Sequence, residues 1–184
     1  MSRPRILIVE DDPVISMGLR DRLKNFGYEI TAMVTTGEEA IEQAKKNKPD
    51  LALMDIKLEG LMDGIEAARS LRTLFDIPVI YVTAFTDEAL LARAKEAEPL
   101  GYLVKPFGER ELRSAIEVAL YKDRMERQVK ESEERFRHLS DIAPFGISIM
   151  ARDRTCEYLN RKFTEIFGYT IDDVPDNHAW LVKA

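Results

Sequence analysis

Short runs of apolar residues, each followed by a reactive polar side chain, recur along the N-terminal part of the chain. The runs cover residues 6–9, 51–54, 79–82 and 100–104, and the side chains that follow them are Glu10-Asp11-Asp12, Asp55, Thr83 and Lys105. Continuous apolar runs of this length are typical of strands that are buried on both faces, as in parallel sheets. Ligands of such sheets bind beyond the carboxyl ends of the strands. The pattern therefore predicts that these polar side chains meet at one edge of a parallel sheet.

Segments with helical periodicity separate the apolar runs. Apolar residues spaced three or four apart mark helices that begin after Asp12, near Gly37, near Ile65, after Asp87 and near Leu112. A weaker strand at residues 30–34 gives five strands that alternate with five helices. Strict alternation with right-handed crossovers produces a doubly wound parallel sheet. We therefore expect an α/β fold of the flavodoxin-like kind, with five parallel strands in the order 2-1-3-4-5.

The acidic residues at this edge predict a site for a divalent cation. Asp11, Asp12 and Asp55 would bring three carboxylates together, which is unfavourable unless a cation neutralises them. Oxygen ligands without histidine favour Mg²⁺ or Mn²⁺ over Zn²⁺. With the ammonium group of Lys105 and the hydroxyl of Thr83, these groups can position a phosphoryl group for attack by a carboxylate oxygen. Asp55 stands alone at the end of the central run and is the expected nucleophile.

Residues 4–122 resemble the receiver domains of two-component response regulators. The resemblance rests on the motifs Glu10-Asp11-Asp12, Met54-Asp55-Ile56-Lys57-Leu58, Asp63-Gly64-Ile65-Glu66, Thr83-Ala84 and Lys105-Pro106-Phe107. It implies a domain that accepts a phosphoryl group from a sensor histidine kinase or a histidine phosphotransfer protein. One departure is visible, because the loop at residues 58–64 is one residue longer than the commonest form in the family and lacks its proline. The shape of that loop is therefore left open.

The resemblance assigns the acidic residues to phosphoryl acceptance and metal binding. Asp55 would be the phosphoacceptor. Mg²⁺ would be held by Asp12, Asp55 and the backbone carbonyl of Lys57, and Asp11 would assist.

The resemblance also assigns the residues that read the phosphoryl group. Its oxygens would be contacted by Thr83, Ala84 and Lys105. Tyr102 falls at the position of the family's switch aromatic and would turn inward when Thr83 moves toward the phosphoryl group. The peptide bond before Pro106 would be cis, as it is in members of the family.

A long charged helix is predicted after the last apolar run. Residues 109–140 contain no proline or glycine, and acidic and basic residues stand four apart along residues 123–137 with the acid first. We expect the fifth helix to continue as a linker over residues 123–140. A sparse apolar track has heptad spacing at Val118, Met125, Val129, Phe136 and Leu139, with Lys122 and Ser132 at two further positions. Pairing of two copies in a coiled coil and a single solvated helix both remain open.

The C-terminal residues resemble the beginning of a PAS sensor domain. The resemblance rests on Ser132-Glu133-Glu134-Arg135-Phe136, Ala143-Pro144-Phe145-Gly146-Ile147, Tyr158-Leu159-Asn160 and Phe167-Gly168-Tyr169. A PAS fold has a five-stranded sheet, whereas this chain has sequence for only its first two strands and the helices that follow. We therefore expect a receiver domain at residues 1–122, a helical linker at 123–140 and a partial α+β PAS region at 141–184, and we assign no cofactor to that region.

Composition narrows the class of partners and the location. The net charge is −6, and no segment is basic, so direct binding of nucleic acid is not expected. The sequence has no apolar stretch long enough to span a membrane and no signal-peptide pattern, so we expect a cytoplasmic protein.

Two other functions compete with a phosphorylation switch. Phosphatases of the haloacid dehalogenase kind also use an aspartate nucleophile, but they need a second aspartate two residues later, where this chain has Lys57. A turnover enzyme is therefore not expected. A protein–protein interaction module that is never phosphorylated would carry a degraded acidic site, whereas the site here is complete in sequence.

Overall fold

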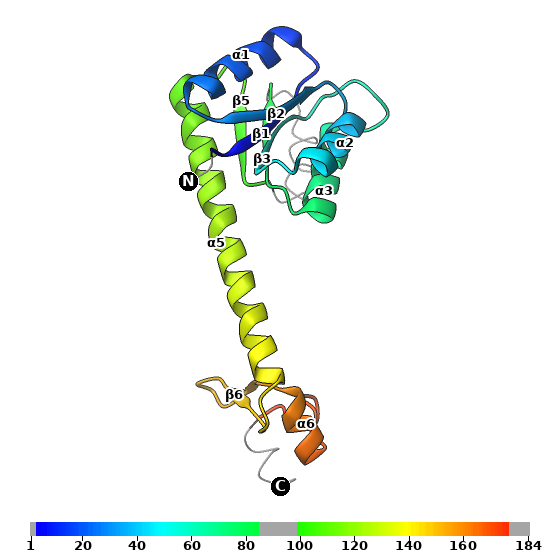
Figure 1. Ribbon diagram of the computed structural model, residues 1–184, viewed down its shortest axis with the longest axis vertical. Helices are drawn as coiled ribbons and strands as arrows, with labels where there is room; N and C mark the ends of the chain where they lie inside the picture. Colours follow the sequence, from blue (N-terminus) through cyan, green and yellow to red (C-terminus); the bar gives the residue numbers. More distant parts are fainter. Residues whose placement is uncertain (1–2, 85–98, 177–184) are drawn as a thin grey trace. The chain divides into compact units, whose positions relative to one another are not determined.

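The structure, a computed structural model, describes residues 3–84 and 99–176. The chain divides into two compact units, Met1–Met125 and Glu126–Ala184. The elements of the first unit are β1 (Arg5–Val9), α1 (Pro13–Asn25), β2 (Glu29–Val34), α2 (Gly37–Asn47), β3 (Leu51–Asp55), α3 (Gly64–Phe75), β4 (Val79–Thr83) and β5 (Gly101–Val104) (Figure 1). The elements that follow are α5 (Glu109–Asp141), β6 (Ser148–Met150), β7 (Cys156–Leu159) and α6 (Arg161–Phe167). The helix expected after Asp87 lies outside the described residues.

The five strands of the first unit form one parallel sheet in the order β2-β1-β3-β4-β5. This is the predicted order, so the flavodoxin-like fold is confirmed. The register places Asp55 beside Val82 and Thr83 beside Val104. The carboxyl ends of the central strands therefore reach the same edge of the sheet.

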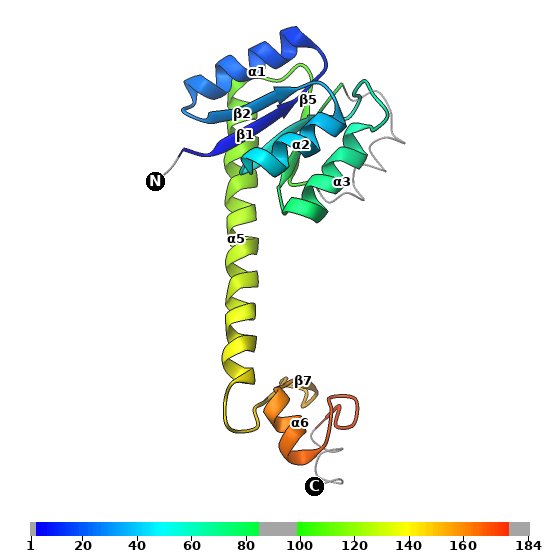
Figure 2. The ribbon, with the colours of Figure 1, turned by 45° about the vertical axis from the view of Figure 1, so that its right-hand side comes forward.

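Both faces of this sheet are covered, which explains why its strands read as continuous apolar runs. Alternate residues such as Leu7, Met54 and Tyr81 pack in one core with α2 and α3. The intervening residues, such as Ile8 and Leu53, pack in a second core with α1 and the first turns of α5 (Figure 2). Successive side chains along a strand point to opposite faces of the sheet, and here both faces are buried.

The helix ends follow the sequence signals. Asp12 caps α1 by accepting hydrogen bonds from the backbone N–H groups of Val14 and Ile15, and Pro13 occupies the first helical position. Asp63 and Glu66 form a capping box at the start of α3. These caps fix where each helix begins relative to the strand before it, and thus fix the loops at the sheet edge.

Helix α5 is one uninterrupted helix of 33 residues. Leu112, Ile116 and Ala119 in its first turns are buried against the sheet. Every residue from 126 to 139 is exposed. No helix within residues 3–84 and 99–176 is long and apolar enough to cross a membrane.

The second unit contains the antiparallel strand pair β6 and β7, followed by α6. Asn160 is fully buried, and its side-chain NH₂ donates to the carbonyls of Ser140 and Phe145 at 2.6 and 3.1 Å. Its side-chain oxygen accepts from the N–H groups of Ile147 and Phe163 at 2.7 and 2.9 Å. This amide therefore connects the C-terminal turn of α5 to the strand pair and to α6.

Candidate functional site

Polar residues from three separated parts of the chain meet at the carboxyl edge of the parallel sheet. Asp55 is the last residue of β3, and Glu10 and Asp11 follow β1 directly. Lys105 follows β5 in the same way. The sequence prediction that these ends come together is met for all four residues.

Lys105 makes the closest polar contacts of the site. Its Nζ donates to Oδ2 of Asp55 at 2.6 Å and to both carboxylate oxygens of Glu10 at 2.8 Å. The second oxygen of Asp55, Oδ1, accepts from the backbone N–H of Lys57 at 3.0 Å. Both oxygens of Asp55 are therefore held at the sheet edge, on a residue that exposes only 8% of its surface.

Burial controls the charge of this site. It raises the pKa of Glu10 to about 7, and the nearby charge of Asp55 acts in the same direction, whereas the hydrogen bond from Lys105 opposes them. Burial would lower the pKa of Lys105, but its hydrogen bonds to Asp55 and Glu10 outweigh that effect and raise it. Lys105 therefore stays charged while the neighbouring acids compete for its single positive charge.

The carboxylates form a cluster that suits a hard cation. One oxygen from each of Glu10, Asp11 and Asp55 lies within 4.8 Å of the others. Oxygen-only donors with several negative charges are the set that Mg²⁺ prefers. The residues present therefore fit a divalent cation of this kind.

Asp12 lies outside the acidic cluster that the structure brings together. It was expected to bind the metal, but the cluster contains Glu10 in its place. The exposed side chain of Asp12 instead caps α1, where it satisfies two backbone N–H groups. The backbone explains the difference, because the N–H of Glu10 still donates to the carbonyl of Val34 on β2 and the residue remains part of the sheet.

The sequence analysis did not predict that Glu10 belongs to the acidic cluster, although Glu10 is the first residue of the Glu10-Asp11-Asp12 motif. The available signal was its position as the first residue after the apolar run. A residue at that position continues the in-and-out alternation of the strand, whereas Asp12 precedes a proline that opens a helix.

Gly64 is a second residue that sequence reasoning did not single out. A Cβ atom at this position would overlap the carbonyl oxygen of Asp55, and the N–H of Gly64 donates to the carbonyl of Ile56 at 3.1 Å. The backbone that enters α3 thus passes directly against the end of β3. The longer loop before it, whose shape was left open, turns through Gly60 at a φ of +123° and leaves Leu61 fully exposed.

The remaining candidate residues lie on β4, β5 and the loop after β5. The carbonyl of Thr83 accepts from the N–H of Lys105 at 2.7 Å, and Ala84 is exposed at the end of β4. The ring of Tyr102 lies 5.8 Å from that of Tyr81. The Lys105–Pro106 peptide bond is cis.

Comparison with known proteins decides the family. The response regulator receiver domain family matches residues 6–117, and a PAS domain family matches residues 134–182. The chain belongs to the response regulator receiver family. Its N-terminal unit is a receiver domain, and the C-terminal match adds a PAS domain to it.

Relatives and solved structures agree with this assignment. The transcriptional regulatory protein PdtaR of Mycobacterium tuberculosis is 42% identical over 116 residues, which cover 63% of this chain and 56% of that protein. The signal receiver domain of a modulated diguanylate cyclase from Desulfovibrio desulfuricans G20 is 38% identical, with a TM-score of 0.66 over 68% of this chain and 99% of its own. The chain spans about half the length of the curated relatives that it matches.

A third comparison bears on the acidic cluster. The receiver domain of the sensor histidine kinase PA1611 from Pseudomonas aeruginosa PAO1 has magnesium coordinated in its active-site cleft. It is 30% identical, with a TM-score of 0.59 over 65% of this chain and 98% of its own. The acidic cluster of the present receiver is consistent with a site of that kind.

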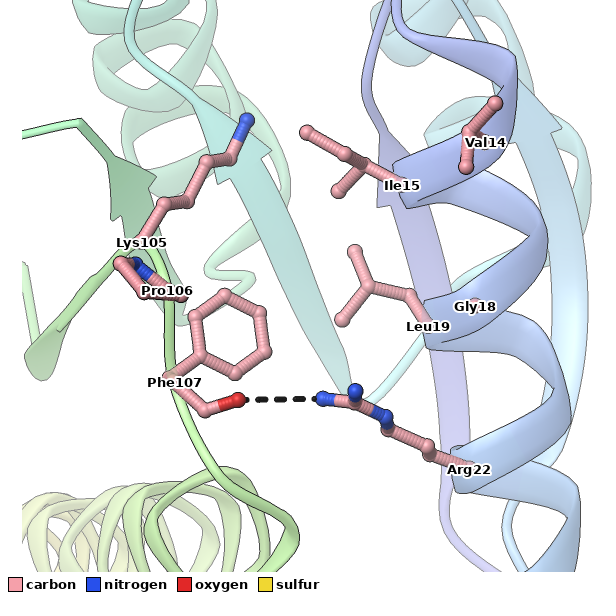
Figure 3. Close-up of a pocket in the computed structure, with 8 residues that line it drawn as sticks. All are labelled: Val14, Ile15, Gly18, Leu19, Arg22, Lys105, Pro106 and Phe107. Atoms are coloured by element: carbon pink, nitrogen blue, oxygen red, sulfur yellow. Dashed lines mark hydrogen bonds between the residues drawn. The ribbon is translucent and has the colours of Figure 1, made fainter.

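A groove lies beside the acidic site, between α1 and the loop after β5. Its volume is about 390 Å³, and Figure 3 shows the residues that line it: Val14, Ile15, Gly18, Leu19, Arg22, Lys105, Pro106 and Phe107. The guanidinium of Arg22 donates to the carbonyl of Phe107 at 3.2 Å and lies over its ring at 5.9 Å. The groove is therefore mainly apolar and has Lys105 at one end.

Proposed function

We propose that this receiver is a phosphorylation switch in which Asp55 accepts a phosphoryl group from the phosphohistidine of a kinase or phosphotransfer protein. The observation that carries the proposal is the position of Asp55, half enclosed by Glu10, Asp11 and Lys105 at the end of a central buried strand. We expect a phosphoryl acceptor and not a turnover enzyme, because residue 57 is a lysine where phosphatases of the haloacid dehalogenase kind need their second aspartate.

The metal ligands that we propose differ from those expected from sequence. Glu10, Asp11, Asp55 and the backbone carbonyl of Lys57 would hold Mg²⁺ (or Mn²⁺), while Asp12 keeps its role as a helix cap. The cation supplies positive charge that offsets the acidic cluster and the oxygens of an incoming phosphoryl group.

The chain's own residues then account for the transfer. A carboxylate oxygen of Asp55 attacks the phosphorus atom, a P–O bond forms, and the P–N bond to the donor histidine breaks with its electron pair returning to the imidazole. Lys105 already bonds Asp55 and Glu10 and would move its ammonium group onto a phosphoryl oxygen. Thr83 and the backbone of Ala84 would contact the other oxygens from the end of β4.

The groove beside α1 suits the donor protein. Its apolar lining ends at Lys105, so a donor helix that packs its apolar face there would bring a histidine close to Asp55. We therefore propose that the kinase or phosphotransfer protein docks on α1 and on the loop after β5. We expect this receiver to act in the cytoplasm.

The switch would be reported through Tyr102 and α5. The ring of Tyr102 already lies beside that of Tyr81, and movement of Thr83 toward the phosphoryl group would hold it in this inward position. We propose a receiver domain at residues 1–122, a linker at 123–140 and a PAS region at 141–184, so the output would pass along α5.

Beryllofluoride, a phosphoryl mimic, tests the proposal without a kinase. We expect Mg²⁺-dependent binding of one beryllofluoride per chain in ¹⁹F NMR, and no binding to Asp55→Asn. Asp12→Asn serves as a matched control with the same charge change in the same site region, and it should bind as the wild type does. Absence of binding to the wild type at saturating Mg²⁺ would contradict the proposal and leave an interaction module on a receiver fold.

A further inference from the structure

Helix α5 carries an apolar track along one face, and most of this track is exposed in the described part of the chain. Val118, Val129 and Leu139 expose 60%, 59% and 58% of their surface. Phe136 packs its ring edge-on against Tyr158 at 5.4 Å, yet it still exposes 45%. Met125 is half-buried and completes the track. Exposed apolar side chains are ordinary when scattered, but a regular row on one helix is a mark of an interface.

The spacing of this row defines what can cover it. The five apolar residues lie at positions of a 4-3 repeat that runs through residues 118, 122, 125, 129, 132, 136 and 139. A repeat of 3.5 residues keeps one face of a helix in contact only with another helix that has the same repeat. A second copy of this chain provides that repeat in full.

We propose that α5 pairs with α5 of a second copy as a parallel two-stranded coiled coil. Each copy offers three heptads of the repeat between Val118 and Leu139 on a helix that is continuous over this range. Every residue from 126 to 139 is exposed in the single chain, and helices that lack tertiary packing are only marginally stable in water. Pairing would supply this stretch with apolar contacts that it largely lacks in the single chain.

The flanking charges favour the parallel arrangement. With Val129 at an a position, Glu126 and Glu133 occupy e positions, and Gln128 and Arg135 occupy g positions. In a parallel pair, g residues face e residues of the next heptad, so Gln128 faces Glu133 of the second copy and no like charges meet. In an antiparallel pair, e residues face each other, which brings Glu126 against Glu133.

Two polar positions within the repeat make the pairing weak. Lys122 occupies an a position and Ser132 a d position. A lysine at an a position fixes the register at the expense of stability, because two ammonium groups lie near each other in a parallel pair. The equilibrium between one copy and two should therefore respond to protein concentration, to salt and to substitutions at Lys122.

This proposal rests on α5 alone and stands apart from phosphoryl acceptance by Asp55. It would hold for the unphosphorylated chain. Failure of Asp55 to take up a phosphoryl group would leave it untouched, and a monomeric chain would leave the phosphorylation proposal untouched.

Sedimentation velocity of the full chain over a wide concentration range tests the pairing. We expect a reversible monomer–dimer equilibrium for the wild type. Val129→Gln with Leu139→Gln should raise the dimer dissociation constant at least tenfold. The matched control, Glu131→Gln with Glu134→Gln, places the same side chains on the opposite face of the helix and should leave the constant unchanged.

A substitution that is expected to strengthen the dimer controls for nonspecific loss of pairing. Lys122→Leu fills the a position and should lower the dissociation constant at least tenfold, while circular dichroism of all variants retains the wild-type helix content. A second copy is excluded if the wild type and Lys122→Leu both remain monomeric at every concentration. The track would then belong to a different partner.

Cross-linking decides the orientation. In a Cys156→Ser background, Met125→Cys should form a disulfide between two copies under mild oxidation, because like d positions face each other in a parallel pair. If the chain dimerises but this variant does not cross-link, the parallel arrangement is wrong.

Discussion

At the scale of single residues, the site depends on which acid of the Glu10-Asp11-Asp12 motif faces the cluster. Glu10 is still hydrogen-bonded to β2 and is buried, so its carboxylate remains over the sheet edge near Asp55 and Lys105. Asp12 lies two residues farther on, where its carboxylate binds the first N–H groups of α1. Two acids of one motif thus have different roles: Glu10 belongs to the acidic cluster, and Asp12 caps a helix.

This difference predicts opposite outcomes for two neutral substitutions. Glu10→Gln removes a carboxylate from the cluster and should weaken Mg²⁺ binding by roughly tenfold, or about 1.4 kcal/mol. Asp12→Asn keeps an N-cap of equal quality and should leave both Mg²⁺ affinity and stability close to wild type. Isothermal titration calorimetry with Mg²⁺ measures both. A larger loss for Asp12→Asn than for Glu10→Gln would restore the sequence-based assignment.

A second residue-scale prediction concerns the paired tyrosines. Tyr81 is fully buried, and its hydroxyl has no hydrogen-bond partner within residues 3–84 and 99–176. A buried unpaired hydroxyl costs about 1–3 kcal/mol, so Tyr81→Phe should raise the free energy of unfolding by about 1 kcal/mol. Urea denaturation of both proteins at neutral pH measures the change, and a loss of stability would reveal a partner for the hydroxyl.

The same hydroxyl predicts a pH dependence. Burial, and then the neighbouring Tyr102, raise the pKa of Tyr81 above its ordinary value. The folded state therefore retains this proton where the unfolded chain loses it, so titration of Tyr81 leaves the stability unchanged below about pH 10 and lowers it as the pH rises beyond that value. Tyr81→Phe should lose stability less steeply than the wild type between about pH 10 and 11.

At the scale of elements, the approach of α3 to β3 determines the shape of the site. The capping box of Asp63 and Glu66 fixes the start of α3 at Gly64. The backbone of Gly64 passes against the carbonyl of Asp55. Any side chain at Gly64 would push the start of α3 away from the acceptor residue. The glycine is required by this close contact and not by an unusual φ.

Two glycine substitutions separate contact from conformation. Gly64→Ala should destabilise the protein by about 2 kcal/mol or more and weaken Mg²⁺ binding, because the end of β3 must shift. Gly18, within α1, has open space around the position of a Cβ atom, so Gly18→Ala should stabilise by about 0.5–1 kcal/mol. Thermal unfolding and a Mg²⁺ titration on each variant check this contrast. Normal Mg²⁺ affinity in Gly64→Ala would contradict it.

The elements could be read from sequence because each has a local cause. Strands that are buried on both faces appear in the sequence as continuous apolar runs. The helix starts are marked by Asp12 with Pro13 and by Asp63 with Glu66. Right-handed crossovers left few topologies, and the observed strand order is the one expected for a flavodoxin-like fold. Local sequence patterns do not show which residues of separate elements come into contact. The contact of Lys105 with Glu10 and the hydrogen bonds from the Asn160 side chain to Ser140 and Phe145 join residues that are far apart in sequence, and none could be derived from spacing. The close approach of Gly64 to Asp55 depends on the path of the loop between them.

At the scale of the whole molecule, the two units have separate cores. The receiver builds its two cores around the parallel sheet, whereas the second unit is centred on Asn160, Phe163 and Val174. Asn160→Ala would remove four hydrogen bonds made by a fully buried side chain and should unfold the second unit. The receiver should keep its Mg²⁺ affinity.

Hydrogen exchange followed by mass spectrometry measures this independence. In Asn160→Ala, peptides from residues 143–176 should lose protection, while peptides from the strands of the receiver should match the wild type. Lost protection in β1 or β3, or lost Mg²⁺ binding, would mean that the two units share their stability.

Phosphoryl acceptance by Asp55 can be measured as the intact mass of the chain after incubation with acetyl phosphate and Mg²⁺. We expect one added phosphoryl group on the wild type, none on Asp55→Asn, and none on the wild type when Mg²⁺ is chelated. A wild type that stays unmodified, or an Asp55→Asn variant that is modified equally, would contradict it.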